Sequence, residues 1–494
     1  MSKDNSYRQI FKSTSIFGLV QVVNILISIV RSKCIAVFLG PAGMGIVSLL
    51  TSTLGLITSL TNFGLSTSAV KNIAAAKAAG DEQKLAKTVA VFRYLVWITG
   101  LLGFIITLIL APWLSEIAFE SKKYTITFML ISITLLFVQI SAGQNVILRG
   151  MRMVQYMARA SSLGAIAGLF ISIPLYMFFL DKGIVPAIIL TSISALIISW
   201  VYARKVKIPD AAIDKEILKT EGVEMLKMGF LISISGLITT GASYLVRIFI
   251  SKNGGVEDVG LYTAGFAIIG TYVSMIFTAM SADYYPRLAA VAHDDVSCKK
   301  EINQQSEIAL LILAPILVLF LVFIQWGITL LYSAQFLGVL DMVHWASIGV
   351  FFQALSWSIG FIFLAKSASK IYFWNELIAN IYILGLNVAG YYFFGLTGLG
   401  ISYLVAYFLH FLQMLVVSNK LYNFSLNKNT LRIFVIQLSI ATICFVSVYF
   451  LKGFLAYLIG SGLLVISSVF SWKELDKMIS IKDVFIKLKN KYAK

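Results

Sequence analysis

Apolar runs long enough to cross a lipid bilayer recur along the whole chain, and short segments richer in charge separate them. About 20 apolar residues wound as a helix span the roughly 30 Å of hydrocarbon in a membrane. Only 13% of the 494 residues are charged, against roughly 25% in a typical soluble domain. The pattern predicts an all-α polytopic membrane protein with fourteen transmembrane helices.

Basic residues distinguish the two sides of the predicted membrane region. The N-terminus, alternate loops and the C-terminal tail hold most of the 40 Lys and Arg residues. The remaining loops hold only Lys122, Lys123, Lys182, Lys252 and Lys452. Loops rich in Lys and Arg stay in the cytoplasm, so both termini are expected to be cytoplasmic. The net charge of +17 is then explained by loops facing an anionic leaflet, and no nucleic-acid partner is expected.

An internal repeat relates the two halves of the chain. At an offset of 215 residues, Gly45 aligns with Gly260, Gly55 with Gly270 and Ser59 with Ser274. We therefore predict two pseudo-symmetric six-helix bundles in the same orientation. The predicted regions are an N-terminal bundle (1–203), an amphipathic cytoplasmic linker (204–228), a C-terminal bundle (229–420), two additional helices (433–471) and a basic cytoplasmic tail (472–494).

Two arginines, Arg31 and Arg247, lie well inside the first and seventh apolar runs. A charge at that depth is costly unless it faces protein or water. We therefore predict a hydrated cationic chamber for a negatively charged cargo. Further polar residues recur at helical spacing on the first, second, seventh and eighth predicted helices. For the small residues among them, helix packing is the simpler explanation. The candidate cavity residues are Arg31, Arg247, Gln21, Asn24, Ser28, Ser59, Asn62, Thr240 and Ser274.

Four basic residues, Arg149, Arg152, Lys366 and Lys370, occupy corresponding inner loops. They are candidates for a cytoplasmic entrance, although the cytoplasmic bias of basic loops explains them equally well. Glu376 follows closely and is expected either to pair with a basic neighbour or to titrate during transport. The three cysteines and three histidines are scattered, and no nucleotide-binding Gly-x-x-x-x-Gly-Lys motif occurs. No enzymatic activity, metal site or cofactor is expected.

Two stretches carry a family resemblance: CIAVFLGPAGMGIVS (Cys34–Ser48) and LAKSASKIYFWNE (Leu364–Glu376). They resemble Wzx-type O-antigen and enterobacterial common antigen flippases of the MOP exporter superfamily. The resemblance implies two six-helix bundles forming a V, embedded in a bacterial inner membrane. It also implies translocation of an undecaprenyl-pyrophosphate-linked oligosaccharide to the outer leaflet by alternating access. Basic residues of a central cavity then bind the anionic cargo, a role that corresponds here to Arg31 and Arg247.

Other readings remain open. Membrane lipids are expected partners, and a glycan polymerase and a chain-length regulator are plausible ones. A MATE-like, cation-coupled exporter of small molecules is the main alternative, but its usually cationic cargo would favour buried carboxylates, and the first apolar run has none. A scaffold for glycan polymerases is a second alternative, and the polar residues on the inner helices argue against it.

Overall fold

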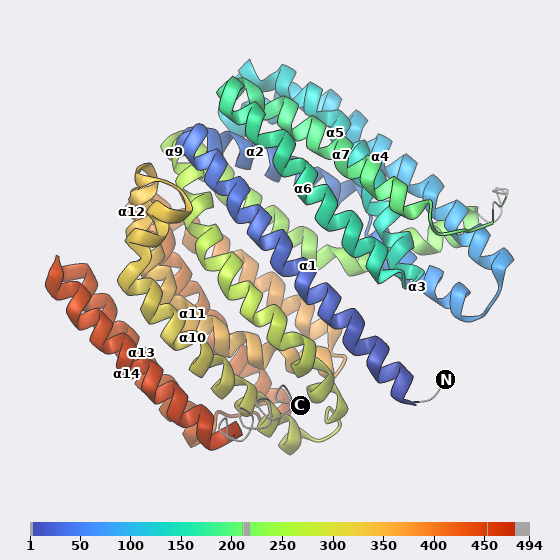
Figure 1. The fold of residues 1–494 in the computed structure, drawn as a ribbon. Coiled ribbons are helices and arrows are strands. Elements are labelled where there is room, and N and C mark those ends of the chain that lie inside the picture. Colours follow the sequence, from blue (N-terminus) through green and yellow to red (C-terminus); the bar gives the residue numbers. More distant parts are fainter. Residues whose placement is uncertain (1–2, 210, 212–217, 452, 480–494) are drawn as a thin grey trace, which may run out of the picture. The chain divides into compact units, whose positions relative to one another are not determined.

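The computed structural model describes residues 3–209, 211, 218–451 and 453–479, and this part of the chain is helical throughout apart from short connections (Figure 1). The helices are α1 (Lys3–Phe38), α2 (Gly40–Thr61), α3 (Leu65–Ala78), α4 (Glu82–Phe119), α5 (Thr125–Gly150), α6 (Val154–Phe179), α7 (Ile184–Ala203), α9 (Val223–Ala290), α10 (Asp295–Leu331), α11 (Leu340–Ala365), α12 (Ser369–Tyr422), α13 (Lys428–Phe450) and α14 (Phe454–Ile479). The predicted all-α membrane fold is confirmed.

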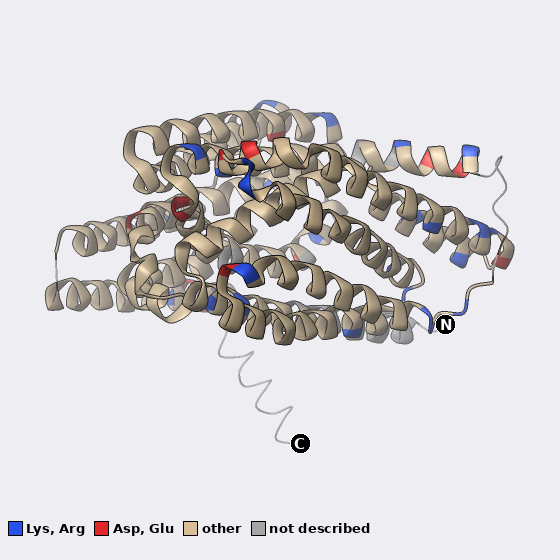
Figure 2. Ribbon diagram, turned by 90° about the horizontal axis from the view of Figure 1, so that it is seen from above, with Lys and Arg blue, Asp and Glu red and all other residues tan. Residues whose placement is uncertain are grey.

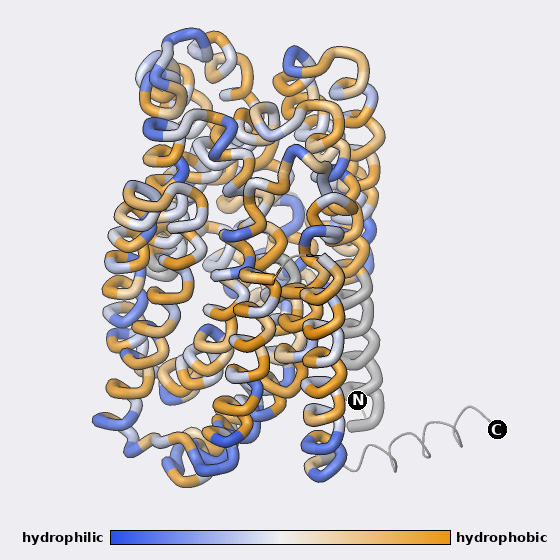
Figure 3. Tube along the Cα trace, turned by 90° about the vertical axis from the view of Figure 1, so that its left-hand side faces the viewer, coloured by the Kyte–Doolittle hydropathy of each residue, from blue (hydrophilic) through white to orange (hydrophobic). Residues whose placement is uncertain are grey.

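Many large hydrophobic side chains are exposed on the helices. Hydropathy along the chain is high over the lengths of the helices, and hydrophilic positions gather mainly at the turns that join them (Figure 3). Charged residues are correspondingly sparse along the ribbon (Figure 2). Large apolar side chains such as Phe170, Phe178 and Phe454 are more than 70% exposed. Such exposure is expected where a helix faces lipid instead of water.

Ten helical stretches among the described residues are long and apolar enough to cross a membrane. Three of them, Val154–Ala203, Gly236–Ser281 and Ser369–Tyr422, each run through a sharp turn. α9 breaks at Gly255 (φ 79°) and α12 at Gly395 (φ 57°), because a left-handed residue interrupts the helical hydrogen bonds. These stretches are long enough for two crossings each, and the count of fourteen spans stays a prediction.

The chain forms two compact units. The first comprises Met1–Leu261 with Leu331–Ser333, and the second comprises Tyr262–Leu330 with Ala334–Lys494. Their boundary lies inside α9, further along the chain than the linker predicted at 204–228. In that linker, residues 210 and 212–217 lie outside the described part. Met225 is fully buried in a hydrophobic cluster that is built mainly from residues of α3, α4 and α5. Leu218 is partly buried and packs against that cluster.

Backbone geometry repeats at the offset of 215 residues found in the sequence. Three pairs of positions with this offset all adopt positive φ angles, which are uncommon for residues other than glycine. The pairs are Gly40 (66°) with Gly255 (79°), Arg152 (56°) with Ser367 (55°), and Leu180 (49°) with Gly395 (57°). The same turns therefore recur in both halves of the chain, which supports the predicted duplication.

A lysine bridge beside one of these turns also recurs, with its two ends exchanged. In the first unit the Lys77 ammonium donates a hydrogen bond to the carbonyl of Met151. In the second unit Lys366 donates to the carbonyl of Ala292 at 2.6 Å. Position 292 corresponds to 77 and position 366 to 151 at the same offset. Each bridge therefore joins the same two equivalent positions. The lysine stands at the first of these positions in one half (Lys77) and at the second in the other half (Lys366).

Candidate functional site

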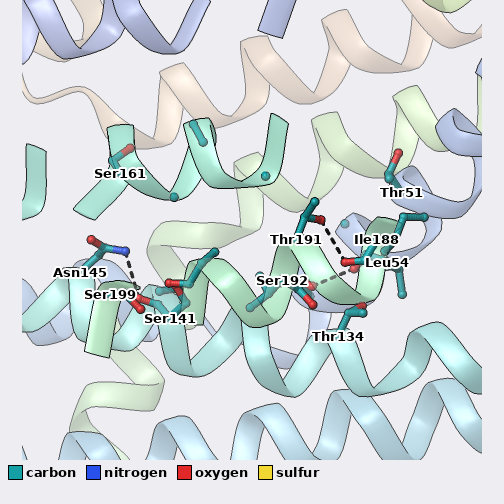
Figure 4. Close-up of a pocket in the computed structure, with 18 of the residues that line it drawn as sticks. Thr51, Leu54, Thr134, Ser141, Asn145, Ser161, Ile188, Thr191, Ser192 and Ser199 are labelled. Carbon is teal, nitrogen blue, oxygen red and sulfur yellow. Dashed lines mark hydrogen bonds between the residues drawn. The ribbon is translucent and has the colours of Figure 1, made fainter. Parts of the chain in front are cut away.

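A cavity of about 910 Å³ lies inside the first unit, bounded mainly by α1, α2, α5, α6 and α7 (Figure 4). On α6 its lining extends from Met157 to Tyr176, a length of about 28 Å at a rise of roughly 1.5 Å per residue. The cavity therefore follows most of the length of α6. Its volume falls at the upper end of the range typical of small-molecule sites, roughly 300–1,000 Å³.

Hydroxyl and amide groups supply most of the polar lining. These residues are Thr51, Thr58, Ser66, Thr134, Ser141, Asn145, Ser161, Ser172, Tyr176, Thr191, Ser192 and Ser199. Two arginines, Arg31 and Arg149, also line the cavity, and no acidic residue does so among the described residues. The site is therefore cationic and rich in hydrogen-bonding groups, which suits an anionic and hydroxylated ligand.

Several of these hydroxyl groups already donate to their own helix. Thr191 donates to the Ile188 carbonyl at 3.1 Å (Figure 4). Ser192 donates to the Ile189 carbonyl at 2.7 Å. A hydroxyl has one proton and two acceptor lone pairs, so these oxygens can still accept hydrogen bonds from a ligand. The α7 wall therefore retains hydrogen-bond acceptors for the hydroxyl groups of a ligand.

Arg31 is half-buried on α1, and its Nε is buried without a hydrogen-bond partner. Ion pairs within the described residues involve Arg287, Lys366, Arg432 and Lys477, and none includes Arg31. A guanidinium held beside a cavity without a carboxylate keeps its charge available to an incoming anion. Arg31 therefore lines the cavity, and its role in binding an anion stays a prediction.

Arg247 lies elsewhere in the first unit. Its Nε donates to the Ser48 hydroxyl at 3.2 Å, and its Nη1 donates to the Ser243 carbonyl at 3.0 Å. Arg247 is not among the residues that line this cavity. This cavity is lined by Arg31 and Arg149 and not by Arg247, so a chamber shared by Arg31 and Arg247 stays a prediction.

The other candidates on α1 divide in the same way. The amide of Asn24 donates to the Ser161 hydroxyl, a cavity residue, at 3.1 Å, and the Asn24 Oδ1 is buried without a partner. Ser28 is exposed. Gln21 lies within α1, but its side chain is outside the described part of the structure. Asn24 therefore borders the cavity, and nothing places Ser28 there.

The remaining candidates on α2 and α9 do not line the cavity. Ser59 donates to the Gly55 carbonyl of its own helix at 2.9 Å. Asn62 accepts a hydrogen bond from Gln139 at 2.8 Å, which ties α2 to α5. Thr240 is half-buried, and Ser274 is exposed within the second unit. The observed bonds of Ser59 and Asn62 are those of helix structure and packing, the simpler explanation weighed from the sequence.

The entrance candidates also separate. Arg149 is exposed and lines the cavity, whereas Arg152 is exposed without lining it. In the second unit, Lys366 forms an ion pair with Asp295 at 2.7 Å, and Lys370 is exposed. Burial alone would lower the pKa of Lys366, but the hydrogen bond to Asp295 and the electrostatic effects of Cys298, Asp295 and Tyr422 together outweigh burial and raise that pKa above its ordinary value. Lys366 therefore has a structural partner in this conformation.

Glu376 is half-buried in the second unit and forms no ion pair with any described residue. The first expected role, pairing with a basic neighbour, is therefore not observed among the described residues. The second role, titration during transport, stays a prediction. Apart from Arg149, the cavity residues of α5, α6 and α7 were not among the sequence candidates. Regular spacing could have identified some of them, because Gly164, Gly168 and Ser172 recur every fourth residue.

Several solved structures share the fold of this chain. The lipid II flippase MurJ in an inward closed conformation matches with a TM-score of 0.70 at 12% identity, covering 95% of this chain and 99% of that one. An inward-facing MATE multidrug resistance transporter matches with a TM-score of 0.65 at 17% identity, covering 82% and 96%. A transporter from Pyrococcus furiosus, described as having a binding pocket of reverse polarity, matches with a TM-score of 0.58 at 16% identity, covering 83% and 96%. The fold is that of the MOP superfamily of membrane transporters.

Within this class, the chain belongs to the polysaccharide biosynthesis protein family, whose model matches residues 10–292. That range includes the whole cavity lining described above. No curated protein matches the chain. The family match confirms the resemblance identified in the sequence at the level of the polysaccharide biosynthesis protein family.

Proposed function

We propose that this protein is a flippase that moves an undecaprenyl-pyrophosphate-linked oligosaccharide from the cytoplasmic to the outer leaflet of the bacterial inner membrane. The observation that carries the proposal is the cavity of the first unit, which contains two arginines, many hydroxyl groups and no carboxylate among the described residues. Membership of the polysaccharide biosynthesis family supports a glycan cargo. The similarity to a lipid II flippase supports a cargo attached to lipid.

The chemistry of such a cargo matches the chemistry of the site. A pyrophosphate group is a strong anion, and the guanidinium of Arg31 can bind it with several directed donors. The glycan is hydrophilic and needs partners for its hydroxyl groups, which the walls of α5, α6 and α7 provide. The polyprenyl tail is apolar and remains in the bilayer while the head group crosses. Alternating access then exposes the site to each side in turn.

Arg149 has a secondary role in this proposal. It is exposed at the end of α5 while lining the cavity, and its loop is cytoplasmic in the predicted orientation. A cation at that position attracts the phosphate groups of the lipid carrier before they reach Arg31. Undecaprenyl carriers of O-antigen, common-antigen or capsule repeat units share this anionic group, so the proposal covers all three.

A MATE-like exporter of small cations is the alternative function, since two solved structures of similar fold are MATE or related transporters. Cationic cargo would be repelled by Arg31 and Arg149, and the described lining offers no carboxylate to offset them. The sign of the cavity charge therefore favours the flippase.

The test uses right-side-out membrane vesicles loaded with the lipid-linked oligosaccharide on the inner face, and it measures glycan exposed at the outer face. Arg31→Gln should reduce the rate at least tenfold, because the variant loses a charge-assisted contact worth roughly 1.5–3 kcal/mol. Arg152→Gln is the matched control, since it removes a charge near the inner mouth from a residue outside the cavity lining, and its rate should stay within about twofold. Unchanged transport by Arg31→Gln, or export of cationic dyes without glycolipid transport, would refute the proposal.

A further inference from the structure

Gly168 on α6 touches the Arg31 guanidinium. A Cβ built on Gly168 would lie 2.7 Å from Arg31 Nη2, and its next neighbours, two carbon atoms of Thr191, would lie at 3.6 and 3.7 Å. Carbon atoms in contact with a polar atom normally lie roughly 3.3–3.6 Å away. Any side chain at position 168 would therefore occupy space that the guanidinium needs, while fitting against Thr191.

The nearby glycine on the same face does not have this constraint. Gly164 is one turn earlier on α6 and also lines the cavity, yet a Cβ there would approach nothing closer than Ala195 at 3.8 Å. Small residues on a membrane helix are commonly explained by close helix packing. At Gly168, however, the closest atom belongs to the end of a charged side chain, so ordinary packing does not account for it.

The environment of Arg31 suggests what this contact achieves. Its Nε is buried without a partner, and Tyr176, two turns beyond Gly168 on α6, lines the same cavity. Because Gly168 has no side chain, the guanidinium can lie close to the backbone of α6 at the wall of the cavity. A side chain at position 168 would push it towards the cavity interior. Its position is therefore set by a missing side chain and not by a carboxylate, which would neutralise the charge.

We propose that Gly168 is a positioning residue for the anion site, because it seats the Arg31 guanidinium where a phosphate group of the cargo is bound. The inference rests on the proposed function and adds to it a residue that determines affinity for the anion. The clash involves the far end of a flexible side chain, which can move without disturbing the backbone. Gly168→Ala should therefore fold normally while shifting the guanidinium away from its binding position.

The experiment measures binding of inorganic pyrophosphate to the full-length protein in nanodiscs by titration calorimetry. Gly168→Ala should weaken binding about tenfold, the loss expected when one charge-assisted hydrogen bond is misaligned. Gly164→Ala, which adds the same methyl group to the same helix face but approaches no atom closer than 3.8 Å, should weaken binding clearly less than Gly168→Ala does. Thermal melting of both variants should match wild type, which shows that the fold is retained.

A double-mutant cycle separates positioning from a general effect on the cavity. In an Arg31→Ala background, adding Gly168→Ala should cause no further loss, because the group that it displaces is absent. Equal losses in both backgrounds, equal losses for Gly164→Ala and Gly168→Ala, or wild-type binding by Gly168→Ala would each overturn the positioning role. If the wild-type protein itself does not bind pyrophosphate, the proposed function fails and this inference fails with it.

Discussion

A buried polar cluster in the second unit joins α13 to α10 and supports a quantitative prediction. The Thr430 hydroxyl lies 2.7 Å from Glu307 Oε1 and 3.0 Å from Asn303 Oδ1. Asn303 also accepts a hydrogen bond from the backbone of Asn427 at 2.8 Å. Thr430 is fully buried, Asn303 is 1% exposed and Glu307 is 6% exposed. Removing the hydroxyl would therefore leave a buried carboxylate without its hydrogen-bond donor.

The perturbation is Thr430→Val, which keeps the shape of the side chain and removes only the donor. The backbone amide of Thr430 still bonds to the Asn427 cap at 2.6 Å, so the helix start is unaffected. Loss of a hydrogen bond to a charged group, with that group left buried, should lower the free energy of unfolding by roughly 2–3 kcal/mol. With Glu307→Gln in the background the acceptor is neutral, and the same change should lower it by only about 1 kcal/mol.

The assay is equilibrium unfolding of the purified protein in detergent, with a double-mutant cycle over positions 307 and 430. A coupling of about 1 kcal/mol or more is expected between the two positions. Thr430→Ser, which retains the hydroxyl and loses a methyl group, should lower the free energy by roughly 0.8 kcal/mol. Equal losses for Thr430→Val in both backgrounds would refute the reasoning, because the carboxylate would then not depend on this donor.

Three further predictions concern other contacts. Gly45→Ala would place a Cβ 1.9 Å from the Val256 carbonyl oxygen, so overpacking should reduce stability by roughly 1–3 kcal/mol in the same unfolding assay, whereas Gly55→Ala, with nothing within 4 Å, should be neutral. The pKa of Asp294 is lowered by hydrogen bonds from Ser297 and from the backbone at the start of α10. The ionised Asp294 carboxylate therefore stabilises the start of this helix above the ordinary carboxyl pKa. This stabilisation is lost as the pH falls through the lowered value. Protection of the amides in the first turn of α10, measured relative to their intrinsic exchange rate at each pH, should accordingly fall on acidification, and this loss should disappear in Asp294→Asn. Lys366→Ala removes the ion pair with Asp295 and the bond to the Ala292 carbonyl, and should accelerate proteolysis in that inner turn.

The sequence predicts the general architecture well because one physical constraint dominates it. Lipid leaves helices as the main way to satisfy backbone hydrogen bonds, so long apolar runs lead directly to the all-α fold. The repeat is also visible in sequence, since Gly40 and Gly255 share the left-handed conformation required at equivalent turns. The count of spans is harder to obtain, because sharp turns such as the one at Gly395 separate runs that are nearly continuous in hydropathy.

The site is predicted less completely. Arg31 is conspicuous in an apolar run, and the structure places it beside a cavity. Arg247 is equally conspicuous, but its hydrogen bond to Ser48 depends on how α9 meets α2, and spacing within one helix carries no such information. The hydroxyls of α5 to α7 could not be separated from packing residues, since serine and threonine serve both purposes in membranes. The contact at Gly168 requires coordinates, because glycine gives no chemical signal of its own.

The exchanged positions of Lys77 and Lys366 affect how sequence similarity between the two halves should be measured. Comparing position 77 with 292, or 151 with 366, pairs a lysine with an alanine and a methionine with a lysine, so any residue-by-residue score counts both as mismatches. Yet each pair encloses the same bridge from an ammonium to a main-chain oxygen. Sequence identity between the two halves therefore underestimates their structural similarity. A search for further internal repeats should compare interacting pairs of residues instead of single aligned positions.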